Sequence, residues 1–166
     1  MALRNIITKE EKSLRRPSRQ VVKFDDRLHT LLDDMRETLF QANGVGLAAP
    51  QVGVNRRVVI VTDENDEVIE LINPEVISAD GEQEGYEGCL SVPGFYGVVR
   101  RPMNVTVKAQ NRDGNEFTVS VEGLLARAFC HEIDHLDGRL YTDIVLGTLI
   151  TAEEMEAMMT EDGDEE

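Results

Sequence analysis

The 166-residue chain has no tryptophan, two cysteines and three histidines. No apolar run approaches the ~20 residues of a membrane-spanning helix, and the N-terminus lacks a hydrophobic stretch typical of a signal peptide. We therefore expect a cytoplasmic protein that is not associated with a membrane. In that reducing compartment Cys89 and Cys130 are expected to stay unpaired, since a cytosolic cysteine that accompanies a histidine pair more often binds a metal or takes part in catalysis.

Basic residues are also scarce. Lysine and arginine number 17 against 32 aspartates and glutamates, which gives a formal net charge of −15. This charge opposes non-specific binding to nucleic acid, and we expect no direct contact with it. Eight acidic residues fall between Glu153 and Glu166, where no basic residue occurs. We expect residues from about 160 to 166 to form a solvated, frayed acidic tail.

The remaining composition is that of a folded domain, with 41% hydrophobic and 30% charged residues. The length suits a single domain over residues 1–166, since neither a linker nor an internal repeat is present. Three helices are expected. The apolar residues at 28, 31, 32, 35 and 39 have the spacing of a buried helical stripe, which Asp25 or Asp26 can cap. The other two helices are expected over residues 124–136 and 152–159.

Two pairs of short extended segments have the pattern of β-hairpins. Residues 57–62 and 68–72 flank the turn-forming sequence DEND, and residues 104–109 and 116–121 flank NRDG. Strands that come in hairpins, rather than alternating with helices, indicate an α+β fold. We predict antiparallel or mixed β-sheets packed around a central helix at 124–136.

That helix carries the sequence HEIDH. Residues four apart lie on one helix face, so His131 and His135 can direct both imidazoles at one metal ion. Glu132 lies about 100° round the helix, where it can reach a water on the ion without being a ligand. The motif predicts a metal-dependent hydrolase.

A catalytic metal site generally needs a third protein ligand. Tyr141 stands where the motif HExxHxxGxxH has its third histidine, so that ligand is absent. Two alternatives are open. Glu154 or Glu156 lies near the distance at which thermolysin-like enzymes have a glutamate. Cys89, in the sequence EGCLS at 87–91, offers a thiolate, a strong ligand for a soft or borderline metal, although a free cysteine is often simply buried.

The segment GVGLAAPQ, residues 44–51, has almost no polar side chain before its final glutamine. It lacks the Lys-Ser/Thr of a phosphate-binding loop. Its small residues suit a backbone pressed against a site, and the amide of Gln51 can donate to an oxyanion.

Taken together, GVGLAAPQ, EGCLS and HEIDH, in this order and at these separations, resemble the three motifs of the peptide deformylase family. The flanking sequence, from about residue 2 to 143, is also similar to that family. The resemblance implies hydrolysis of the N-formyl group from the starting methionine of nascent polypeptides, with release of formate. The implied substrate is therefore a nascent chain near the ribosome.

The resemblance also assigns the metal ligands. It implies that Cys89, His131 and His135 bind one divalent ion and leave a fourth position for water. It favours Fe²⁺ as the native ion, while a Cys/His/His set also suits Zn²⁺, Ni²⁺ or Co²⁺.

Three further groups receive catalytic roles from the resemblance. Glu132 takes a proton from the water and returns it to the leaving amine. The side chain of Gln51 and the backbone N–H of Leu90 stabilise the oxyanion.

Helix geometry predicts a pocket for the methionine side chain. Leu124, Arg127 and Ala128 lie on the same helix face as His131. Leu124 and Ala128, with Val45 opposite, are expected to form an apolar wall, and plain core packing is the competing interpretation. Arg127 is expected to lay its stem along that wall with its charge in water.

Two further roles concern backbone and helix orientation. Gly44 and Gly46 leave backbone groups free to pair with an extended peptide. Asp134 is expected to pair with Arg101 and so to orient the helix, a role that the resemblance supports.

The chain departs from the family pattern at two places. Residues 93–97, PGFYG, stand where some members carry an arginine that holds the substrate backbone, and the C-terminus is acidic where others have a long basic helix. We expect a monomer. The alternative functions are an endopeptidase that shares only HExxH, or a catalytically silent peptide-binding relative.

Overall fold

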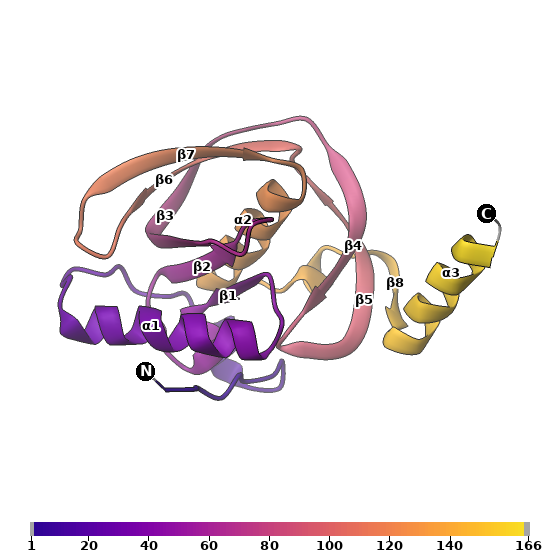
Figure 1. Ribbon diagram of the computed structural model, residues 1–166, viewed down its shortest axis with the longest axis horizontal. Coiled ribbons are helices and arrows are strands. Elements are labelled where there is room, and N and C mark those ends of the chain that lie inside the picture. Colours follow the sequence, from indigo (N-terminus) through magenta and orange to yellow (C-terminus); the bar gives the residue numbers. More distant parts are fainter. Residues whose placement is uncertain (1, 165–166) are drawn as a thin grey trace.

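The computed structural model describes the backbone of residues 2–164 and the side chains of residues 2–160. Its elements are three α-helices, eight strands and three short 3₁₀ helices, which are arranged as two sheets with α1 and α2 packed against the larger one (Figure 1). The helices are α1 (Asp26–Gln41), α2 (Gly123–Leu136), α3 (Ala152–Asp164), η1 (Lys12–Arg15), η2 (Ala49–Val52) and η3 (Tyr141–Asp143). The strands are β1 (Gly46–Ala48), β2 (Val58–Thr62), β3 (Val68–Asp80), β4 (Gln83–Cys89), β5 (Val92–Arg101), β6 (Asn104–Gln110), β7 (Glu116–Glu122) and β8 (Leu146–Thr151).

The strands form one five-stranded sheet, in the order β1-β2-β3-β6-β7, and one three-stranded sheet, in the order β4-β5-β8. Every pairing between these described strands is antiparallel, which confirms the predicted α+β class. Both predicted hairpins are confirmed as β2–β3 and β6–β7. β3 continues beyond the predicted segment to Asp80, because its second half pairs with β6. The register of this pairing shifts between Ile72 and Glu75, where Asn73 has a φ of +52°.

β2 lies between α1 and α2, with one helix on each face. Alternate side chains of a strand point to opposite faces, and here Val58 and Ile60 pack in the cluster under α1 while Val59 and Val61 pack in the cluster under α2. All five residues of β2 are buried as a result. Its continuous apolar run therefore reflects burial on two sides.

The structure confirms α1 and its cap. The Asp25 carboxylate accepts the N–H of Leu28 at 3.2 Å, and the predicted stripe is buried. Gln41 ends the helix, and Asn43 follows it in the left-handed region with a φ of +54°. The helix at 124–136 is confirmed as α2.

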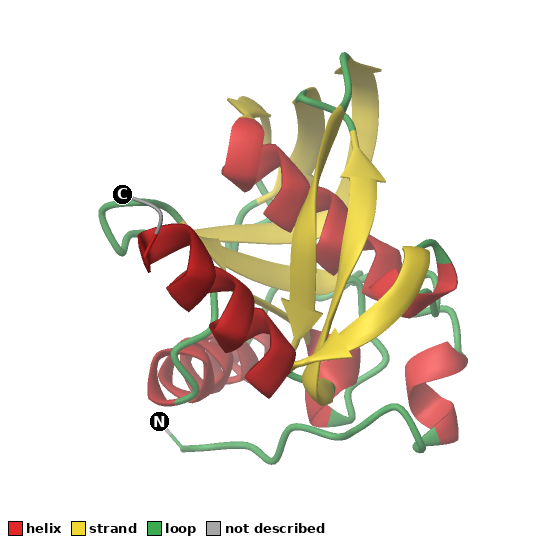
Figure 2. Cartoon of the chain, turned by 90° about the vertical axis from the view of Figure 1, so that its right-hand side faces the viewer, coloured by secondary structure: helices red, strands yellow, loops and turns green. Residues whose placement is uncertain are grey.

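The three-stranded sheet was not predicted. β4 is rich in glutamate and glycine, and β5 contains Pro93 and two glycines, all of them poor strand formers. α3 packs beside this sheet, against β5 and β8, and stands away from α1 on the opposite side of the molecule (Figure 1). It lies in the foreground of Figure 2. It continues to Asp164, so this part of the predicted frayed tail is helical, whereas residues 165–166 lie outside the described part. Each described helix is too short or too polar to cross a bilayer.

Candidate metal centre and active site

α2 and the end of β4 bring three metal-ligating side chains together. Successive turns of α2 carry His131 and His135, both buried, and β4 ends at Cys89. One donor atom from each of the three residues lies within 4.8 Å of the other two, and the Cys89 Sγ is 3.4 Å from Nε2 of His135. Two imidazoles and one thiol are a donor set that fits a divalent transition metal.

Glu87 sets the orientation of the His131 ring. The Nδ1–H of His131 donates to Oε1 of Glu87 at 2.9 Å, which leaves Nε2 as the atom available to an ion. Arg101 donates two hydrogen bonds to the same carboxylate, at 2.9 and 3.0 Å. Burial raises the pKa of Glu87, but the hydrogen bonds from His131 and Arg101 outweigh it and lower that pKa to about 2. Glu87 therefore stays ionised. Its position at the start of EGCLS was the sequence signal for a role that we did not predict.

The predicted environment of Arg127 is wrong. Its guanidinium is buried, with 7% of the residue exposed, and donates to Glu87 at 2.7 Å and to the carbonyls of Gly85 and Val99 at 3.2 and 3.1 Å. A Cβ on Gly85 would lie 3.3 Å from Nη2 of Arg127, so the glycine leaves room for the side chain to turn inward. The charge of Arg127 thus neutralises a buried carboxylate instead of lying in water.

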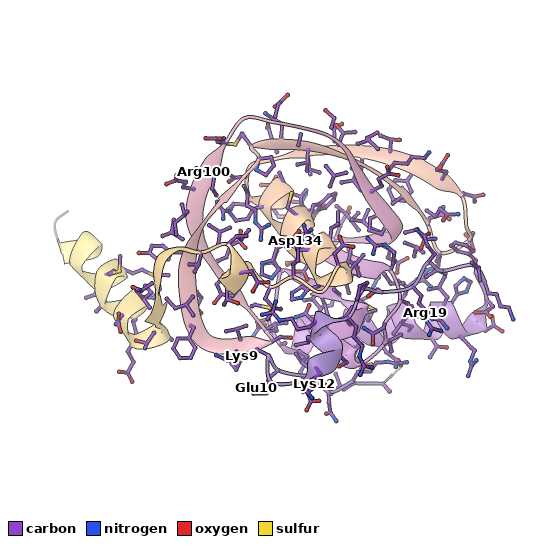
Figure 3. All side chains as sticks on the ribbon, turned by 180° about the vertical axis from the view of Figure 1, so that it is seen from behind. Lys9, Glu10, Lys12, Arg19, Arg100 and Asp134 are labelled. Atoms are coloured by element: carbon purple, nitrogen blue, oxygen red, sulfur yellow. The ribbon has the colours of Figure 1, made fainter. Side chains whose placement is uncertain are left out.

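Arg101 also reaches α2. Its Nη1 donates to Oδ2 of Asp134 at 2.7 Å, and Asp134 lies on α2 near the middle of the view in Figure 3. One arginine thus contacts both Glu87, on β4, and Asp134, on the helix that carries the two histidines. The structure contains the ion pair that was expected between Asp134 and Arg101.

Glu132 is buried beside the three candidate ligands. Its Oε1 has no hydrogen-bond partner among the residues that the structure describes, and neither has Nδ1 of His135. Burial raises the pKa of Glu132 to about 7, although the charge of His131 opposes the shift. Gly46 leaves the space that this carboxylate occupies, because a Cβ at Gly46 would lie 2.6 Å from Oε2 of Glu132. A buried carboxyl group with one free oxygen and a pKa near neutrality is suited to proton transfer.

Gln51 joins the first motif to the second. Its Oε1 accepts the backbone N–H of Ala48 at 2.9 Å, which fixes the side-chain amide. Its Nε2 then lies 3.1 Å from Oγ of Ser91 and 3.6 Å from Sγ of Cys89. Leu90 follows Cys89 in the tight turn between β4 and β5. The Gln51 amide and the Leu90 backbone are therefore both next to the thiol.

The predicted substrate residues differ in their exposure to solvent. Val45 and Leu124 are 58% and 82% exposed, so core packing is excluded for Leu124. Ala128 packs against the cluster between α2 and the five-stranded sheet. A Cβ at Gly44 would lie 2.9 Å from the side chain of Leu90, so this glycine allows the first motif to approach the second closely.

The sequence matches known proteins over most of its length. A sequence model of the family described as polypeptide deformylase matches residues 3–147. The chain is 56% identical to a peptide deformylase of Caldicellulosiruptor bescii over 156 residues, which span 94% of this chain and 93% of that protein. The crystal structure of a peptide deformylase from Legionella pneumophila has 46% identity and a TM-score of 0.84, with 87% of each chain covered. The peptide deformylase structure from Thermotoga maritima has 36% identity and a TM-score of 0.86, covering 89% of this chain and 100% of that one.

Proposed function

The chain belongs to the peptide deformylase family, as a hydrolase that releases formate from the N-formylmethionine of newly synthesised polypeptides, and we propose that it does so at Cys89, His131 and His135. The observation that carries this proposal is the convergence of these three donor atoms within 4.8 Å. The bond between His131 and Glu87 supports it, because metal-binding histidines usually donate their second ring N–H to such an acceptor.

We propose Fe²⁺ as the native ion, with Zn²⁺, Ni²⁺ or Co²⁺ as substitutes. A site with one thiolate and two imidazoles suits each of these ions. A divalent ion held there would polarise the formyl carbonyl and lower the pKa of a water molecule. The burial of His131 and His135 supports the proposal because it keeps these two ligands away from bulk solvent.

Glu132 is the proton-transfer group in this proposal. It takes a proton from the attacking water and delivers it to the nitrogen of the leaving amine as the C–N bond breaks. Its burial supports the role, because a carboxyl group with a pKa of about 7 can both accept and donate a proton near neutral pH. The Oε1 atom without a partner is free to receive that proton.

Gln51 and Leu90 stabilise the negative charge that develops on the formyl oxygen. Hydrogen bonds to Ala48 and Ser91 hold the Gln51 side chain in advance, so its amide is already oriented beside the thiol before the substrate binds. The backbone N–H of Leu90 supplies the second donor.

The peptide is proposed to bind along β1. This strand is the first in the order of the five-stranded sheet, so one of its edges has no neighbouring strand within the described chain. The backbone at Gly44 and Gly46 can add an extended peptide to this edge. Val45, Leu124 and Ala128 are proposed to surround the methionine side chain. Arg127 is not part of this proposed pocket, because its guanidinium group forms an ion pair with Glu87.

We further propose that the protein acts as a monomer in the cytoplasm on formylated chains near the ribosome. The size of the domain and its strongly negative charge support action on peptides rather than direct binding to nucleic acid.

Replacement of the thiol tests the site. Cys89→Ala and the matched control Cys130→Ala, purified without oxygen, are compared for metal content and for formate release from formyl-Met-Ala-Ser. Cys89→Ala is expected to lose both, and Cys130→Ala neither, because Cys130 is not among the converging donors. An active, metal-loaded Cys89→Ala protein would refute the site. Cleavage of an N-acetylated peptide, or of an internal peptide bond, by the wild type would instead indicate an endopeptidase.

A further inference from the structure

Tyr141 is buried against the ring of His131. The two ring centroids are 5.9 Å apart with an interplanar angle of 24°, and only 1% of Tyr141 is exposed. His135 contacts the same ring edge-on, with a centroid separation of 5.1 Å. Glu87 fixes the position of Nδ1 of His131, but one hydrogen bond at one ring atom does not by itself fix the plane of the ring. The stacked tyrosine opposes a tilt of that plane.

The hydroxyl of Tyr141 makes a second connection, to the strand that follows EGCLS. It donates to the carbonyl of Phe95 at 3.2 Å. Phenylalanine at this position would preserve the stacking and lose only the hydrogen bond.

Phe95 belongs to the segment 93–97, in which this chain departs from the pattern of some family members. Its side chain is partly exposed, with 38% of the residue accessible to solvent. It pairs with Thr151 of β8, and the ammonium group of Lys9, in the N-terminal arm (labelled in Figure 3), lies 5.5 Å from its ring centroid. The register of β5 on β8 shifts directly after Tyr96, so the strand is irregular here.

We propose that Tyr141 is a positioning residue which fixes both the ring of His131 and the backbone at Phe95. Its ring holds the plane of His131, and its hydroxyl holds the backbone at Phe95 at a fixed place relative to that ring. The proposal includes that part of the substrate backbone passes along residues 93–97, so that Tyr141 keeps it in register with the reacting centre. This inference rests on the proposed function, because it takes His131 to be a metal ligand.

Two substitutions separate the two contacts. Tyr141→Phe is expected to raise KM for formyl-Met-Ala-Ser about 3- to 10-fold, as expected for one neutral hydrogen bond, with kcat within about twofold of wild type. In the metal-free protein, hydrogen exchange over residues 93–97 should become faster. Tyr141→Leu removes the stacking as well, so it should also change the visible absorption spectrum of the Co²⁺-substituted protein and lower kcat at least about 10-fold.

Tyr86→Phe is the matched control, because Tyr86 is a half-exposed tyrosine of β4 whose hydroxyl lies near Sδ of Met158 rather than the site. It should leave KM, exchange and the Co²⁺ spectrum unchanged. The proposal is overturned if Tyr141→Phe has the KM and exchange rates of wild type, or if folded Tyr141→Leu keeps the wild-type spectrum. His131→Ala is measured in parallel. If it does not alter the Co²⁺ spectrum, the assignment of His131 as a ligand fails, whatever the tyrosine variants do.

Discussion

Glu87 and His131 form a buried pair in which the carboxylate, 2.9 Å from Nδ1, decides which ring nitrogen faces the candidate metal site. Glu87→Gln keeps the shape of the side chain but removes the charge that balances Arg101 and Arg127. We expect the affinity for the metal to fall about 10- to 100-fold, measured by competition with a chelator.

Glu84→Gln is the control for this substitution. Glu84 lies on the same strand and pairs with Arg100 in an exposed position. Its replacement should leave the metal affinity unchanged. Equal affinity in Glu87→Gln and wild type would contradict the role of Glu87.

Gly46 is in contact with Glu132. A methyl group at this position would lie 2.6 Å from Oε2, so Gly46→Ala must displace either the carboxylate or β1. Formate release should fall at least about 10-fold, since a displacement near 1 Å is costly in a catalytic site. The metal content should be unchanged.

The matched control is Gly53→Ala, where the added methyl group meets no atom within 4 Å although the φ of +83° makes the substitution strained. It should lower stability by about 1 kcal/mol and leave the turnover rate unchanged. If Gly46→Ala is as active as Gly53→Ala, the close approach of position 46 to Glu132 does not affect catalysis.

Gln51 is predicted to act on the transition state rather than on the metal. Gln51→Ala removes the amide that Ala48 and Ser91 hold. We expect kcat to fall about 10²- to 10³-fold, as for the loss of other oxyanion donors, while the metal stoichiometry stays at the wild-type value. Steady-state kinetics with metal analysis test this. A raised KM with an unchanged kcat would argue against the assignment.

Asp34 links the N-terminal arm to α1, and its ionisation is predicted to stabilise the fold. Its oxygens accept the N–H of Ala2 at 2.7 Å and a hydrogen bond from Arg4 at 3.0 Å. Burial raises the pKa of Asp34, but these contacts outweigh it and lower the pKa below its usual value of 3.8. The stabilisation is thus complete above pH 3.8 and is lost as the pH falls through the lower folded-state value.

Asp34→Asn should therefore cost about 1–3 kcal/mol of unfolding free energy at pH 6, and less as the pH falls below 3.8. Denaturant titrations of the metal-free protein at several pH values measure this difference. Glu64→Gln, in the exposed β2–β3 turn, should show no such trend. A difference for Asp34→Asn that does not change with pH would contradict the linkage.

Local patterns in the sequence predicted those elements whose stability is also local. The α1 stripe and its Asp25 cap, the β2–β3 and β6–β7 hairpins and the extent of α2 all follow from side-chain period and turn chemistry. β4 and β5 also form a local hairpin, but their glycines, their proline and their charged residues do not give the alternating pattern of a strand. β8 pairs with β5 across more than 40 residues of chain, a contact that no local pattern encodes.

The candidate site divides in the same way. The histidine spacing on α2 is local, whereas the 3.4 Å approach of Cys89 to His135 joins segments 46 residues apart. Local reasoning left Cys89 as one of two alternatives, and the resemblance selected it. The inward turn of Arg127 depends on the space beside Gly85 and on the charge of Glu87. Sequence alone treats a lysine or arginine on a helix as a solvent-exposed residue, and so the prediction for Arg127 was wrong.

The most direct test of the account is formate release by wild type and Glu132→Gln, both purified without oxygen, with the metal content measured in the same samples. Glutamine fills the same buried volume but cannot accept the proton of the attacking water. We predict that the variant keeps the metal stoichiometry of the wild type and loses formate release at least about 100-fold. A variant that keeps both its metal and its full activity would contradict the account.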